Sequence, residues 1–379
     1  MTSYRYCTVA AFGLTISALA ASSQLAAGQE KDRHRATVEK GVQYLLTKGQ
    51  SVDGSFSKQT GTGITSLCVT ALLRSGRSPN DPGVAKSLKY LEANIRPDGG
   101  IYAENSRLKN YETCIALMCL KEANQNGRYD EAIAGADRYI KGLQLDAEEK
   151  KDPSDFSYGG VGYSAGRPDL SNPAFLVDAL IAAGNGPDDE AVKKALIFVS
   201  RCQNLESEHN TTPHAAKIND GGFYYSITDE TDNERQKSPD GGLRSYGSMT
   251  YAGLKSMVHA GLKPDDPRVK AALSWLGKHY DLKSNPGQGD AGLYYYYHLM
   301  AKALGALGQE HFVDAGGKKH DWRGELTAEL ASRQNSDGSW VNKNNRFLES
   351  DANLVTAFAL LALSHAKSER TPADRNPTR

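Results

Sequence analysis

The segment Gln334-Asn335-Ser336-Asp337-Gly338-Ser339-Trp340 lies between a polar, helix-like stretch and an apolar one. Its Asp-Gly pair is typical of a tight corner, because glycine adopts positive φ without steric cost and aspartate accepts a hydrogen bond from its own backbone. Turn residues followed by an aromatic residue recur at 51–56, 96–102 and 219–224. Recurrence at intervals of about 45–60 residues indicates stacked helical units, since one such unit cannot bury its apolar face alone.

Six helical hairpins are predicted between and around these corners. In the fourth, Val192, Ala195, Leu196 and Val199 follow the i, i+3, i+4, i+7 spacing of an amphipathic helix. The second helix of each hairpin is expected at 64–73, 112–123, 173–183, 249–260, 293–307 and 354–364.

The two helices of a hairpin differ in character. First helices carry charged residues on one side, as surface helices do, whereas second helices such as 354–363 are apolar nearly all round and should be buried on every side. Six exposed and six buried helices in alternation predict an all-α, (α/α)6 toroid with an inner and an outer ring. The alternative is an open superhelix, which would leave one face of each second helix in water.

The composition limits the functional classes. A formal net charge of zero over 379 residues gives no basic surface of the kind that binds nucleic acid.

The N-terminus resembles an export signal, because Arg5 is followed by the apolar run 8–21 and by small residues near Ala27. We therefore expect a signal peptide at 1–28, one toroid domain at 29–366 with an insert loop at 204–243, a disordered tail at 367–379, and a secreted or periplasmic protein without a stable transmembrane segment.

Four cysteines remain after the predicted signal peptide: Cys68, Cys114, Cys119 and Cys202. Four are too few for a disulfide framework, and each falls within a predicted helix, so buried thiols are the simplest interpretation. A bridge from Cys68 to Cys114 or Cys119 is the alternative in an oxidising compartment.

The hairpins and the Gln…Asp-Gly-Ser-Trp corners resemble the terpenoid cyclase and protein prenyltransferase superfamily, in particular its squalene-cyclase-like, prenyltransferase-repeat members. The resemblance covers 34–366, and the segments 169–174 and 246–254 are similar to those of secreted bacterial members. The corner motif is structural, so the resemblance implies the fold more strongly than an activity.

The catalytic residues of that family are matched only in part. Zinc-dependent prenyltransferases use an Asp-x-Cys pair and a histidine, where this chain has Asp290, Gly292 and Val355. One carboxylate does not make a zinc site, so we expect neither a metal nor another cofactor. Squalene-type cyclases donate a proton from an Asp-x-Asp-Asp run, and the nearest stretch here contains Glu349 and Asp351.

Asp351 with Glu349 is therefore the candidate catalytic acid, since an apolar cavity raises the pKa of a carboxyl group toward that of a proton donor. Asp351 also stands immediately before an apolar helix, where an N-cap belongs, and capping is the favoured interpretation.

Candidate ligand-binding residues are aromatic or cationic. Of the four tyrosines at 294–297 at most two, such as Tyr294 and Tyr297, can share the cavity face, and with Tyr251 they could contact an isoprenoid chain or a carbocation. Packing of these tyrosines between neighbouring helices is the favoured interpretation. His298 is most simply a core or rim histidine. Arg244 is one of several cations near the inner-helix N-termini, where helix dipoles would favour an anion.

The resemblance and these residues together predict a protein that binds an apolar or isoprenoid-like small molecule in its barrel, without zinc-dependent prenyl transfer and with no protein partner specified. One alternative is a proton-initiated cyclase that uses Asp351. Another is a non-catalytic extracytoplasmic scaffold or a glycan-processing toroid.

Overall fold

The computed structural model describes residues 28–164, 167–227 and 237–367. Apart from Gly28, the predicted signal peptide lies outside the described residues, and so does the predicted tail beyond Lys367. The predicted insert at 204–243 is described except for 228–236.

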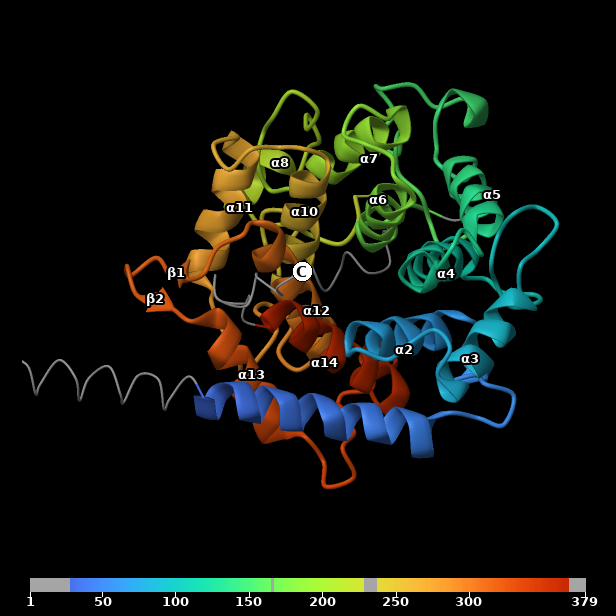
Figure 1. Cartoon of the computed structure of the whole chain (residues 1–379). Coiled ribbons are helices and arrows are strands. Elements are labelled where there is room, and N and C mark those ends of the chain that lie inside the picture. Colours follow the sequence, from blue (N-terminus) through green and yellow to red (C-terminus); the bar gives the residue numbers. More distant parts are fainter. Residues whose placement is uncertain (1–27, 165–166, 228–236, 368–379) are drawn as a thin grey trace, which may run out of the picture.

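Six helices form a closed inner ring (Figure 1). Each inner helix contacts the following inner helix, and the last one contacts the first. The toroid predicted from the sequence is therefore confirmed, and the open superhelix is excluded. The inner helices are α2 (Gly63–Arg74), α4 (Lys109–Ala123), α6 (Ser171–Ala183), α10 (Gly247–His259), α12 (Leu293–Ala306) and α14 (Ala352–Ala366).

The outer helices surround this ring, and each precedes its inner partner in the sequence. They comprise a helix at 28–44 that continues into a π-helical turn, η1 (Leu45–Gly49), followed by α3 (Pro82–Glu92), α5 (Asp130–Lys141), α7 (Glu190–Arg201), α11 (Pro267–Lys278) and α13 (Trp322–Arg333). In α5 only the stripe Ile133, Ala136 and Ile140 is buried, whereas α6 is buried from Ser171 to Leu180 without interruption. This difference is the one that the sequence pattern predicted.

Short elements lie in the connections between the helices. They are η2 (Lys58–Thr60), η3 (Ala147–Glu149), α8 (Ala215–Ile218), η4 (Arg346–Leu348) and an antiparallel pair, β1 (Phe312–Val313) with β2 (Lys319–His320), in which Phe312 faces His320. The two ends of the insert are held together, because buried Asn204 donates from Nδ2 to Leu243 O at 2.6 Å.

The Asp-Gly corners share one geometry. Gly54, Gly99, Gly221 and Gly338 have φ of 90°, 89°, 81° and 91°. A Cβ at any of them would overlap the backbone carbonyl of an adjacent outer helix. Glycine is therefore required at each corner both for the backbone conformation and for the close approach.

A glutamine side chain fastens each of several corners to that neighbouring outer helix. Gln334 Nε2 donates to Gly338 O at 2.9 Å and to Thr37 O at 3.0 Å, which joins the last corner to the first helix. Gln203 Nε2 bonds in the same way to Gly221 O and Arg268 O, both at 2.9 Å. These amides satisfy buried carbonyls that would otherwise be costly to remove from water.

The four described cysteines are free and buried, so the interpretation as buried thiols is confirmed and the Cys68 bridge is not formed.

Gly338→Ala should lower the free energy of unfolding by clearly more than Gly76→Ala. Both glycines have φ near 90°, but a Cβ at Gly76 has nothing within 4 Å, whereas one at Gly338 would overlap Lys40 O. We expect a loss of about 1 kcal/mol at Gly76 from backbone strain, and of several times that at Gly338. Urea unfolding of the two variants measures the difference, and equal losses would show that the close approach is unimportant.

Candidate functional site

A cavity of about 290 Å³ opens where the N-termini of the six inner helices meet. Every inner helix contributes at least one residue from its first two turns, so the cavity exists only because the ring is closed. Its wall consists of Thr60, Gly63, Ile64, Leu108, Tyr111, Tyr163, Ser171, Phe175, Tyr225, Tyr246, Ser248, Met249, Gly292, Tyr295, Phe347, Leu348, Leu354 and Phe358.

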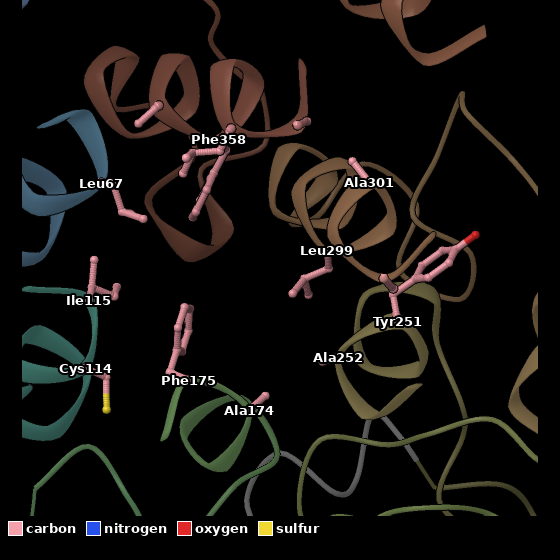
Figure 2. Close-up of a cluster of buried hydrophobic side chains, with 14 of the residues drawn as sticks. Leu67, Cys114, Ile115, Ala174, Phe175, Tyr251, Ala252, Leu299, Ala301 and Phe358 are labelled. Carbon is pink, nitrogen blue, oxygen red and sulfur yellow. The ribbon is translucent and has the colours of Figure 1, made fainter. Parts of the chain in front are cut away.

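Aromatic rings form a continuous part of this wall. Tyr111 meets Phe175 edge to face at a centroid distance of 5.0 Å, Phe175 lies 6.2 Å from Tyr295, and Tyr295 lies 5.5 Å from Phe358. Figure 2 shows Phe175 and Phe358 pointing into the middle of the ring from α6 and α14. These rings come from four inner helices, α4, α6, α12 and α14, and they give the cavity an apolar surface with polarisable faces.

One polar group in the wall has no partner. The Tyr295 hydroxyl is buried and forms no hydrogen bond among the described residues. Burial holds the pKa of Tyr295 well above its ordinary value, so the phenol is neutral. Two further hydroxyls at the same cavity, those of Tyr163 and Tyr225, lie 3.4 Å apart. The cavity can therefore hold an apolar ligand, and the Tyr295 hydroxyl is a polar group of the wall that has a hydrogen bond left to make.

Carboxylates near the mouth cap the inner helices instead of lining the cavity. Asp351 Oδ1 accepts from Asn353 N at 2.9 Å and from Leu354 N at 3.1 Å, as the capping interpretation predicted. Glu349 Oε1 accepts from Tyr295 N at 2.8 Å, at the start of α12. The described wall contains neither of them.

Asp169 has the same role on α6, where its Oδ1 accepts from Ser171 N at 2.8 Å. Burial raises the pKa values of both Asp169 and Glu349, and their hydrogen bonds oppose that shift. Because carboxylates already complement these helix ends, the N-terminal rim has less attraction for a free anion than the helix dipoles alone suggest.

The cavity face of α12 differs from the predicted one. Tyr295 is the wall residue, and Tyr294 and Tyr297 do not belong to the described wall. Tyr297 instead donates its hydroxyl to Leu282 O at 2.6 Å, and Tyr294 packs edge to face on Tyr297 at 5.7 Å. Tyr251 points away from the middle of the ring in Figure 2 and lies 5.6 Å from Tyr296.

The other two predicted ligand-binding residues also lie outside the wall. His298 is buried behind it, stacked on Phe358 at 5.8 Å, and burial lowers its pKa so that the imidazole is neutral. Arg244 is exposed and donates to Lys237 O at 3.3 Å. Contact of these residues, or of Asp351 and Glu349, with a ligand stays a prediction.

Sequence reasoning missed Tyr111, Phe175 and Phe358. A signal for them exists, since each is an aromatic residue in the first half of an apolar inner helix. Whether such an aromatic residue faces the cavity depends on the rotation of its helix within the ring, which one sequence does not reveal.

The fold is that of helical toroid enzymes. A type II terpene cyclase from Scytonema, MstE, is similar at a TM-score of 0.52 and 15% sequence identity, over 89% of this chain and 98% of the cyclase. A D-mannose isomerase is similar at a TM-score of 0.56 and 12% identity, over 89% of this chain and 97% of the isomerase. At these identities the likeness establishes the architecture alone.

No protein-family profile matches the sequence, and no curated protein matches it. Within the described residues, no helix combines the length and the apolar character needed to cross a membrane.

Asp351→Ala should lower the free energy of unfolding by about 1 kcal/mol, because the side chain caps α14. Asp351→Asn is the matched control: asparagine caps as well as aspartate, so this variant should keep nearly all of the stability. Chemical unfolding measures both variants. If both lost the same amount, the negative charge of Asp351 and not its capping bond would be what matters.

Proposed function

We propose that this protein binds a small apolar ligand of isoprenoid type in the cavity at the N-terminal ends of its inner helices. The observation that carries the proposal is the aromatic wall with the buried, unpartnered hydroxyl of Tyr295 beside it. A volume of about 290 Å³ is near the lower end of ligand pockets, which suits a short chain. Burial of apolar chain carbons supplies the affinity, at about 0.8 kcal/mol for each methylene.

The comparison with the cyclase supports the same ligand class. MstE has been solved with its substrate, geranylgeranyl dihydroxybenzoate, in a toroid of similar fold. The corner motif and the six hairpins also resemble the terpenoid cyclase and prenyltransferase superfamily. We propose membership of that superfamily, and an extracytoplasmic location that follows from the export-like segment before the toroid.

Binding is favoured over cyclisation because no carboxyl group lines the described wall. A proton-initiated cyclase needs an acid within reach of the bound double bond. Asp351 and Glu349 accept hydrogen bonds from helix N-termini, so protonation of either would weaken a cap.

A sugar is a poorer match to the wall, although the D-mannose isomerase has a similar fold. Recognition of a sugar needs several fixed polar groups, and leaving its hydroxyls unpaired in an apolar cavity is costly.

Farnesol should bind saturably with one molecule per chain in native mass spectrometry, and D-mannose should not bind. The reverse result would replace this proposal with the glycan-processing one.

Tyr295→Phe should weaken farnesol binding about 2- to 10-fold, the effect of one lost hydrogen bond, and leave binding of the hydrocarbon farnesene unchanged. Tyr251→Phe is the matched control, because Tyr251 also has a buried hydroxyl without a partner but lies outside the wall. Fluorescence titrations give the four affinities. If Tyr251→Phe weakened farnesol binding and Tyr295→Phe did not, the ligand would occupy a different place.

Incubation with farnesol should return the alcohol unchanged. Gas chromatography that revealed a cyclised product, lost in Asp351→Asn, would favour the cyclase instead.

A further inference from the structure

A second pocket lies at the opposite end of the barrel. It has a volume of about 430 Å³ and is formed by the last turns of the same six inner helices. Its lining residues are Arg74, Met118, Lys121, Glu122, Asp178, Ile181, Ala182, His259, Lys302 and His365. None of them belongs to the wall of the apolar cavity.

A buried charge cluster forms one side of this pocket. Asp178 Oδ2 lies 2.5 Å from Lys255 Nζ and 2.6 Å from Lys302 Nζ, and its Oδ1 lies 2.9 Å from His259 Nδ1. The side chains of Asp178 and Lys255 are 4% and 1% exposed. Burial alone would raise the pKa of Asp178, but Lys255 and Lys302 outweigh it and hold that pKa well below the ordinary value.

The cluster has more positive than negative charge. Two ammonium groups share the single carboxylate of Asp178, and the pocket also contains Arg74 and Lys121 against Glu122. Burial lowers the pKa of Lys255 to about 8, so its ammonium group is still protonated at neutral pH. At that pH four cations thus face two carboxylates among the side chains named. His365 adds no charge, because burial and the nearby Arg74 and Lys302 lower its pKa to about 3.

An uncompensated charge in a poorly solvated site is costly, and a bound anion removes that cost. The cations are placed to reach such an anion. Lys302 keeps 14% of its side chain exposed and uses one N–H for Asp178, while Arg74 is 28% exposed and contacts Glu122 and His365 Nε2. The ammonium and guanidinium groups belong to α2, α4, α10 and α12, so the ring itself brings them together.

We propose that this pocket binds a dianion of the phosphate class, through Lys302, Arg74 and Lys121. The excess of two positive charges matches a dianion better than a monocarboxylate. The inner-helix C-termini, with their partial negative charge, account for some of the cations, but they do not require two lysines on one buried carboxylate.

Titration of the full chain with inorganic phosphate near neutral pH, where Lys255 keeps its proton, tests the proposal by calorimetry at constant ionic strength. Saturable binding is expected, and Lys302→Gln should weaken it at least about tenfold, as for a charge-assisted hydrogen bond. Lys194→Gln is the matched control, since Lys194 is also partly exposed and pairs with Asp146 at a different pocket. It should leave the affinity unchanged.

Lys121→Gln provides a second variant, because Lys121 is exposed and its replacement should not disturb folding. It should weaken phosphate binding several-fold. Acetate should bind at least about tenfold more weakly than phosphate, since it carries one charge. Absence of saturable binding, equal affinity for acetate, or equal effects of Lys302→Gln and Lys194→Gln would overturn the proposal and leave the cations as counter-charges for the helix ends.

Discussion

The contact between the last inner helix and the first is the constraint on which the rest of this structure depends. It brings α14 against α2 and lets Gln334 bond to Thr37 O, across almost the entire described chain. Asn353 Nδ2 donates to Ser57 Oγ at 3.0 Å and so adds a further bond across the same junction. Without closure, the wall of the apolar cavity would lose one side, and apolar inner helices would be exposed to water at a cost of about 25 cal/mol for each Å².

Closure also orders the electrostatics of the molecule. Since the inner helices all run in one direction, their N-termini gather at one end and their C-termini at the other. Carboxylates such as Asp351 cap the first end, and cations such as Lys302 stand near the second, each complementing the helix dipole. The barrel thus has an apolar, aromatic end and a cationic end, and two proposed ligands of different chemistry follow from one arrangement of helices.

Much of the architecture could be predicted from the sequence because its signals are local. The stripe at Val192 to Val199 and the Asp-Gly corners depend on residues a few positions apart. The stripe lies on α7, and the glycines of the corners have the positive φ that such turns need. The capping of α14 by Asp351 was predictable for the same reason.

The sites were harder to predict because they depend on the rotation and the neighbours of each helix. Four consecutive tyrosines of α12 point to every side of that helix. Only tertiary contacts, such as the hydrogen bond from Tyr297 to Leu282 O, determine that Tyr295 faces the cavity. Asp178, Lys255 and Lys302 lie on three inner helices far apart in the sequence. Their one sequence signal was a charged residue within an otherwise apolar, buried helix, which demands a partner.

The central claim is that the closed ring encloses an apolar binding site at the N-terminal ends of its inner helices. A crystal structure of the protein grown with farnesol tests it most directly. The account predicts electron density for the chain between Phe175 and Phe358, with the alcohol oxygen within hydrogen-bonding distance of the Tyr295 hydroxyl. Density for farnesol elsewhere, or side chains that fill this space and leave no cavity, would contradict it.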